Sequence, residues 1–162
     1  MGEHDSKHER DMKAEYSKLQ QKHQLPSLDV LDREFSVGQL DQTGFALRSV
    51  ANKMQDRCDY VRKMLGDLIQ PDNHIADMQE AESLGQAEKK KVFEIFRKLS
   101  YYSKELVLQD LDYDEKACAE LIKKLFAEWA AIKPDLVSVL SSARDTWNGS
   151  KVSRQDSAGY FG

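Results

Sequence analysis

The feature that most constrains the fold of this chain is an apolar stripe that runs through residues 117–147. Its members recur at steps of four and three residues, with two consecutive steps of four at the end: Cys118, Ile122, Leu125, Trp129, Ile132, Leu136, Val139, Ala143 and Trp147. Side chains three and four positions apart lie on the same side of an α-helix. The stripe therefore predicts one long helix, whose buried face is widened by Leu121, Phe126 and Leu140.

A proline, Pro134, interrupts this stripe. Proline lacks a backbone N–H and clashes with the preceding helical turn, so it kinks or ends a helix. The apolar phase nevertheless continues beyond it. The sequence therefore predicts either one kinked helix or two nearly coaxial helices.

A second stripe predicts another long helix over residues 43–69. Its steps alternate between four and three without a miss over three heptads: Leu47, Ala51, Met54, Cys58, Val61, Leu65 and Leu68. This pattern is typical of coiled-coil or antiparallel-bundle packing. The break at Gln70-Pro71-Asp72 ends the helix.

A third long helix is predicted over residues 87–110. Ser83 and Gln86 have the spacing of a capping box, which satisfies free N–H groups at a helix start. The side chains expected to point inward are Val92, Ile95, Phe96, Leu99, Tyr102 and Leu106. The acidic segment 112–115 then favours the start of the final helix, because carboxylates stabilise the positive end of the helix dipole.

The ends of the chain are less strongly patterned. A helix is expected from about residue 9, with a thin stripe at Met12, Tyr16 and Leu19 that predicts weak docking, and residues 1–8 are expected to fray. Ser27 is a suitable N-cap for a short helix that ends near Phe35. Residues 148–162 are small and polar and are predicted to form a disordered tail, whose Tyr160-Phe161 pair fits either a short recognition peptide or an inert terminus.

The sequence thus predicts an all-α fold: an antiparallel helical bundle of three long helices plus one or two N-terminal helices, forming a single domain over residues 9–147. Only three prolines and eight glycines punctuate the chain, which agrees with long helices. At ~1.5 Å per residue the last helix is about 50 Å long, against about 40 and 36 Å for the others. The apolar residues at its far end need a packing partner, and we expect the N-terminal helices to provide it in preference to a second molecule.

Composition excludes several classes of protein. No run approaches the roughly 18–20 apolar residues that a membrane span needs, and the first 11 residues are charged throughout, unlike a secretory signal. We therefore expect no membrane association and a cytoplasmic location. Cys58 and Cys118 both fall on the apolar stripes, so they are expected to be buried, reduced thiols that do not act as nucleophiles.

Metal-site and cofactor motifs are incomplete. Asp110–Asp114 resembles the opening of a calcium loop, but the positions that require glycine and glutamate hold Glu115 and Leu121. His4 and His8 are four residues apart, yet a metal site needs further ligands. No glycine-rich phosphate loop occurs. We expect no catalytic residue, no cofactor and no metal ion.

The helix predicted over residues 87–110 carries the best candidate for a contact surface. Basic residues recur every seven positions beside an aromatic one: Lys90, Arg97 and Lys104, with Tyr101. Six basic residues face three acidic ones between positions 88 and 109, a pattern that fits a phosphate backbone. Glu94 lies four residues after Lys90, however, and such pairs are ordinary on a solvated helix face.

Several short segments resemble small helical proteins of archaeal genomes that have no known activity. These segments are caps, breaks and core positions, within a resemblance that spans about residues 19–147: Leu25–Asp29, Leu31–Phe35, Gln70–Asp72, Glu128-Trp129 and Lys133-Pro134. The resemblance implies a helical fold and assigns no functional residue.

These observations favour a non-enzymatic cytoplasmic protein-interaction or assembly module. Its partner would be another protein or a second copy in a homodimer. The alternative is a protein that binds RNA or the ribosome through the basic face described above. A further alternative is a small-ligand or metal site inside the bundle, because bundle sites are assembled from dispersed side chains.

Overall fold

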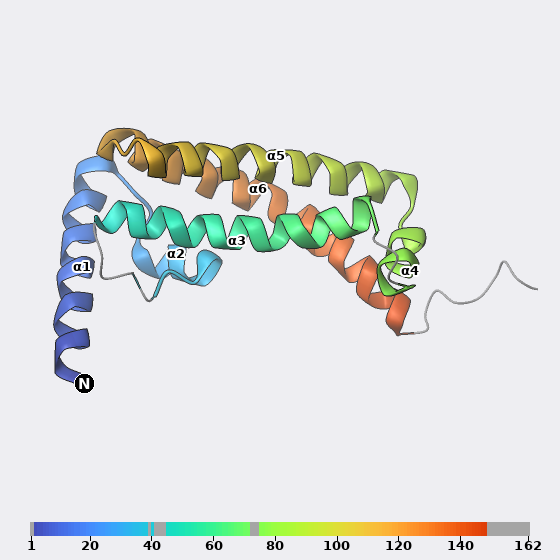
Figure 1. The fold of residues 1–162 in the computed structure, drawn as a ribbon, viewed down its shortest axis with the longest axis horizontal. Coiled ribbons are helices and arrows are strands. Elements are labelled where there is room, and N and C mark those ends of the chain that lie inside the picture. Colours follow the sequence, from blue (N-terminus) through green and yellow to red (C-terminus); the bar gives the residue numbers. More distant parts are fainter. Residues whose placement is uncertain (1, 39, 41–44, 72–74, 149–162) are drawn as a thin grey trace, which may run out of the picture. The chain divides into compact units, whose positions relative to one another are not determined.

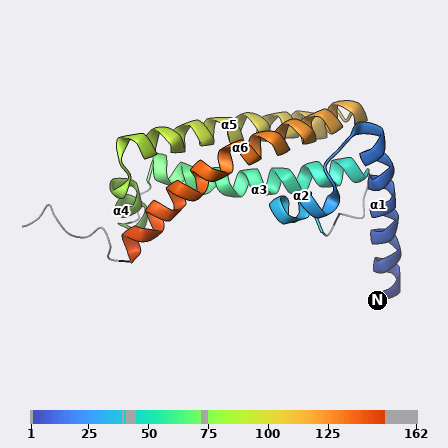
Figure 2. The ribbon, with the colours of Figure 1, turned by 180° about the vertical axis from the view of Figure 1, so that it is seen from behind.

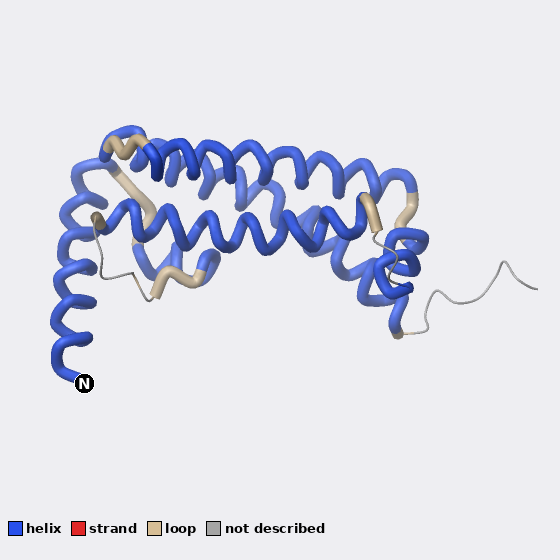
Figure 3. The backbone as a smooth tube through the Cα atoms, viewed as in Figure 1, coloured by secondary structure: helices blue, strands red, loops and turns tan. Residues whose placement is uncertain are grey.

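The computed structural model describes residues 2–38, 40, 45–71 and 75–148, with side chains described from residue 11 onward. Over these residues the chain is helix or connecting loop, with no strand (Figure 3). The helices, in chain order, are α1 (Gly2–His23), α2 (Leu28–Phe35), α3 (Ala46–Ile69), α4 (Ile75–Ser83), α5 (Gln86–Leu111) and α6 (Glu115–Trp147) (Figures 1 and 2). The predicted all-α class is confirmed, and the helices pack as a bundle.

The chain divides into two compact units, each built from two segments. The first unit holds Met1–Arg62 and Lys98–Ala131, and the second holds Lys63–Arg97 and Ile132–Gly162. Helices α3, α5 and α6 each contribute residues to both units. That residues 9–147 form a single domain stays a prediction, and the tail predicted over 148–162 lies, apart from Asn148, outside the described residues.

In the first unit, the apolar stripes of the long helices meet in one core. Its buried members from α3, α5 and α6 are Leu47, Val50, Ala51, Met54, Cys58, Val61, Leu99, Leu106, Cys118, Ala119, Ile122, Leu125 and Trp129. Polar contacts tie α3 to α5 at two levels. The Arg48 Nε lies 2.7 Å from Asp110 Oδ1, and the Ser103 hydroxyl donates a hydrogen bond of 2.8 Å to Asp59.

The short helix α2 packs against α6 in this unit. Ser27 caps it as predicted, its Oγ accepting a hydrogen bond from the Val30 N–H at 3.4 Å. The Phe35 and Trp129 rings lie 5.0 Å apart between centroids, tilted by 48°. The Trp129 indole N–H donates to Glu34 Oε2 at 2.9 Å, which satisfies the polar atom of this buried ring.

Helix α1 begins at Gly2, whereas the sequence predicted a start near residue 9. The fraying expected of residues 1–8 stays a prediction. Tyr16 is completely buried, and its hydroxyl donates a hydrogen bond of 2.7 Å to the Pro26 carbonyl. The contact of α1 with the segment just before α2 is therefore made by one large side chain.

The second unit continues the same stripes. Its buried apolar residues are Leu65, Leu68, Ala81, Leu84, Val92, Ile95, Ile132, Leu136, Val139 and Ala143. The Lys91 ammonium lies 2.7 Å from Asp135, and the Ser142 hydroxyl donates a hydrogen bond to Glu88. These contacts join α5 to α6.

Within the second unit, the far end of α6 contacts α4 and the start of α5. The cover that we expected from the N-terminal helices, which belong to the first unit, stays a prediction. The Trp147 indole N–H donates to Glu80 Oε1 of α4 at 2.6 Å. Trp147 itself is 54% exposed, although its position in the stripe predicted burial. The last turn of α6 therefore contributes an indole hydrogen bond in place of a core side chain.

Helix boundaries resolve two open points. Helix α6 runs through Pro134 as one helix, so the interpretation as two separate helices is wrong. The capping box predicted at Ser83 is also wrong. Helix α4 extends to Ser83, and the Ser83 hydroxyl donates a hydrogen bond to the Glu80 carbonyl. The Gly85 N–H instead donates to Glu88 Oε2 at 2.9 Å. A side chain in the first turn of α5 thus caps the backbone that precedes the helix.

Candidate functional site

The structure places the four residues of the predicted contact surface on α5, and all of them are exposed: Lys90, Arg97, Tyr101 and Lys104. Lys90 and Arg97 belong to the second unit, whereas Tyr101 and Lys104 belong to the first. We therefore consider the two pairs separately.

The basic residues that flank this surface are engaged with α6. In the second unit the Lys91 pKa is raised by its hydrogen bond to Asp135. In the first unit the Lys98 ammonium lies 2.6 Å from Glu128 Oε1. These two bases therefore hold helices together, and they add less positive charge to the surface than the sequence suggested.

Tyr101 lines a groove in which acidic residues outnumber basic ones. The Tyr101 ring contacts Tyr102 edge-on, with 5.3 Å between the ring centroids. Both rings line an open groove of about 600 Å³, whose charged lining residues are four acids and one base: Glu105, Asp112, Asp114, Glu120 and Lys124. The excess of acids in this groove repels a phosphate backbone. Lys104 does not line the groove, so its role in a contact surface stays a prediction.

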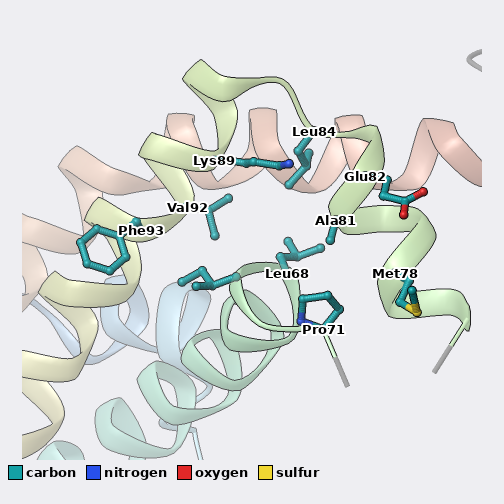
Figure 4. Close-up of a pocket in the computed structure, with 10 residues that line it drawn as sticks. Leu68, Pro71, Met78, Ala81, Glu82, Leu84, Lys89, Val92 and Phe93 are labelled. Carbon is teal, nitrogen blue, oxygen red and sulfur yellow. The ribbon is translucent and has the colours of Figure 1, made fainter. Parts of the chain in front are cut away.

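A second hollow, in the second unit, is apolar. It has a volume of about 330 Å³ and is lined mainly by hydrocarbon side chains from α3, α4 and α5 (Figure 4): Leu68, Ile69, Pro71, Met78, Ala81, Glu82, Leu84, Lys89, Val92 and Phe93. We call this hollow the apolar pocket. Its size and lining are those of a site that accepts apolar groups.

Local sequence explains how the pocket forms. Helix α3 ends at Ile69, and Pro71 prevents its continuation, which leaves Leu68 and Ile69 at an open helix end. Helix α4 follows with buried Ala81 and exposed Met78. The Glu88 carboxylate caps α5 at its start, which fixes the first turns that carry the remaining lining residues.

The rim of the pocket exposes large apolar side chains. Ile69 is 40% exposed, Met78 44% and Phe93 56%, and Ile75, one turn before Met78 on α4, is 75% exposed. Scattered apolar residues are normal on protein surfaces, but a contiguous group around a hollow marks a contact site. The pocket is therefore the strongest candidate functional site among the described residues.

Opposite charges stand on the two sides of this rim. Glu82 lines it from α4, and Lys89 lines it from α5 (Figure 4). Two more acids of α4, Asp77 and Glu80, add negative charge to this helix but do not line the pocket. The Glu80 carboxylate accepts its hydrogen bond from a neutral indole, so its charge is not compensated by that contact.

The thiols lie in the core of the first unit. Burial raises the pKa of Cys58 to about 12 and that of Cys118 to about 12, and each has a nearby acid that adds to the shift. The thiolate is the nucleophilic form, so both side chains are unreactive near neutral pH. The Cys118 Sγ instead points to the Leu47 carbonyl at 3.7 Å.

A cluster of charged groups at the start of α6 was not visible in the sequence. Glu115 Oε1 lies 2.7 Å from the Lys22 ammonium and 2.8 Å from His23 Nε2. The hydrogen bond from Lys22, followed by that from His23, lowers the pKa of Glu115. This contact joins α1 to α6, and its partners are more than 90 positions apart in the chain.

No three histidine, cysteine, aspartate or glutamate side chains within the described part of the chain are placed to hold a metal ion. The four acids of the open groove thus do not converge on one point. The side chains of His4 and His8 lie outside the described side chains. None of the described helices combines the length and the apolar character that crossing a membrane requires.

Comparisons with models of protein families, with curated proteins and with solved structures find no match for this chain.

The apolar pocket was not predicted from the sequence. A signal was present in the large apolar residues that lie off the helix stripes on either side of the break at Pro71. Phe93 does not belong to the predicted inward face of its helix, and Ile69 lies beside the stripe of its own helix, where it favours packing against a further neighbour. Met78 follows Ile75 by three residues on a helix with few other apolar residues. Off-stripe residues of this size, close to a helix break, favour an open contact surface.

Proposed function

We propose that the protein is a non-enzymatic interaction module that binds an apolar segment of a protein partner in the apolar pocket. The exposed rim around the pocket carries this proposal. Burying one large apolar side chain contributes about 1.5–3 kcal/mol. A partner that buries Phe93 and Met78 therefore gains binding free energy of this size from each. The lining comes from the end of α3, from α4 and from the start of α5, all within the second unit.

We further propose that the three long helices run antiparallel, with the N-terminal helices packed across them. The numbering of contacting residues supports this arrangement within each unit. In the first unit Arg48 meets Asp110, whereas Asp59 meets Ser103 eleven positions later on α3 and seven positions earlier on α5. In the second unit Glu88 meets Ser142, and Lys91 meets Asp135.

We place this module in the cytoplasm. Both cysteines are free and buried, which suits a compartment that keeps thiols reduced.

Peptide selection tests the proposed docking site. Phage-displayed peptides are selected on the whole protein, and the dissociation constants of the selected peptides are measured by calorimetry. Replacing Phe93 by serine removes an exposed ring from the pocket, whereas Val137→Ser removes an apolar side chain of equal exposure, 56%, from α6. We expect Phe93→Ser to weaken binding about tenfold or more, since each 1.4 kcal/mol is tenfold.

Peptides that bind wild type and Phe93→Ser equally well would refute the pocket as the contact. A second copy of the chain is the other molecule that could occupy the pocket through self-association. Light scattering over a range of concentrations measures it, and a dimer that Phe93→Ser converts to a monomer would assign the pocket to a second copy.

Binding of RNA or the ribosome is a second candidate, supported by the exposure of Lys90 and Arg97 in the second unit and of Lys104 in the first. Such binding weakens steeply as salt concentration rises, because counterions are released. A triple charge reversal at these positions should abolish retention on an RNA column. Unchanged retention would remove this candidate.

A further inference from the structure

We infer that the segment bound by the apolar pocket is an amphipathic helix with two oppositely charged flanks: basic beside α4 and acidic beside the start of α5. This inference rests on the proposed function, because it assumes that the pocket holds a protein segment. It adds the chemistry by which the segment is recognised.

The lining indicates a helical segment. The pocket lies among helices, and the part of the chain that the structure describes has no strand whose edge could extend into a sheet with a peptide. A helix instead inserts apolar side chains three and four residues apart into a hollow between helices. Ile69, Met78 and Phe93 are exposed around the opening and would contact that apolar face.

The charge on α4 selects a basic flank. Over Ile75–Ser83 this helix carries Asp77, Glu80 and Glu82 and no basic residue. Glu82 is exposed and lines the pocket. Glu80 accepts a hydrogen bond from Trp147 of α6 and does not line the pocket, so Glu82 is the acid of α4 that faces a bound segment.

The charge on α5 selects an acidic flank. Lys89 lines the pocket and is exposed, and Lys90 follows it on the same helix. Two neighbouring charged residues of α5 contact other partners. Lys91 pairs with Asp135, and the Glu88 carboxylate accepts hydrogen bonds from the Gly85 N–H and the Ser142 hydroxyl. Neither of them lines the pocket.

Exposed ion pairs are individually weak, so their role here is selectivity. Each contributes about 0.2–1 kcal/mol, which corresponds to roughly a 1.4- to 5-fold change in affinity. One contact on each flank together gives about 2- to 25-fold selectivity at low salt. That selectivity should fall as the ionic strength rises, because the Debye length is only about 10 Å at 0.1 M.

Two synthetic helical peptides with the same composition and the same apolar face test the inference. In the two-sided peptide all lysines lie on one flank and all glutamates on the other, and in the mixed peptide each flank holds both. Fluorescence anisotropy measures their binding to the whole protein at 20 and 300 mM salt. We expect the two-sided peptide to bind about fivefold more tightly at low salt, with most of that advantage lost at high salt.

Charge reversal on either side of the rim provides the second measurement. Glu82→Lys and Lys89→Glu should each reduce the advantage of the two-sided peptide to about twofold or less. Asp56→Lys, the reversal of an exposed acid on α3 in the first unit, is the matched control and should leave the advantage unchanged.

The outcomes separate the two proposals. Equal binding of both peptides, weakened by Phe93→Ser in each case, would overturn the charged-flank inference while supporting the docking site. Binding of neither peptide would overturn the docking site itself. A dimer seen by light scattering that excludes both peptides would show that a second copy is the occupant, and would also overturn the inference.

Discussion

Tyr16 offers a direct test of how firmly α1 is held. The thin apolar stripe of this helix predicts weak docking, whereas the structure buries the Tyr16 side chain completely and pairs its hydroxyl with the Pro26 carbonyl. Tyr16→Phe removes only the hydroxyl and leaves that carbonyl without its donor. We expect a loss of about 1 kcal/mol in the free energy of unfolding, the usual net contribution of one hydrogen bond.

Tyr16→Ala removes the ring as well and leaves a cavity at the contact of α1. Truncation of a buried aromatic residue to alanine costs about 3–5 kcal/mol, a large share of the roughly 5–15 kcal/mol that stabilises a domain. Tyr60, which is 59% exposed in the same unit, is the matched control, and Tyr60→Ala should change stability by less than about 0.5 kcal/mol.

Urea titration followed by circular dichroism measures all three variants. With a slope of about 1–3 kcal/mol per molar urea, the Tyr16→Ala midpoint should fall by one molar or more. If Tyr16→Ala costs no more than Tyr60→Ala, the N-terminal helix is weakly docked, as its sequence pattern predicted, and the burial argument fails.

Three further predictions concern other parts of the chain. Gly66→Ala should raise the free energy of unfolding by about 0.5–1 kcal/mol, because alanine favours a helix interior and its Cβ would meet the Phe96 ring at an ordinary 3.5 Å; a loss in urea titration would contradict this. Cys58 and Cys118, whose pKa values are raised to about 12, should react with a thiol reagent at pH 8 only at the rate of unfolding, and rapid labelling of the native protein would show that they are accessible. The pKa of Glu115 is lowered in the folded state. The contribution of its carboxylate to the free energy of unfolding is therefore present above the unfolded pKa of about 4.3 and is lost as the pH falls below that value. The stability difference between wild type and Glu115→Gln should therefore shrink between pH 5 and pH 3, and a difference that does not change with pH would refute the contact.

The helices were predictable because the stripes encode both local conformation and burial. Met54, Leu99 and Trp129 were predicted to lie inward, and all three are buried. Helix α2 ends at Phe35, where the sequence placed its end, because the Ser27 cap and the spacing of its apolar residues are local signals.

Long-range contacts were not predictable from one sequence. The pairing of Lys98 with Glu128 joins residues 30 positions apart, and no pattern within either helix marks it. The basic stripe therefore looked more positive in sequence than it is in the fold. The pocket was missed for a related reason: Ile69, Met78 and Phe93 come from three different helices, and only the fold brings them around one hollow.

The two tryptophans give this chain a built-in optical readout. Trp129 is 5% exposed in the first unit, whereas Trp147 is 54% exposed in the second. A shielded indole emits at shorter wavelength than a wetted one, so the two emission bands differ without any added dye. Single-tryptophan variants would then report whether the two units melt in one step or in sequence, and the emission of Trp147 would respond to a change in its hydrogen bond to Glu80 on α4.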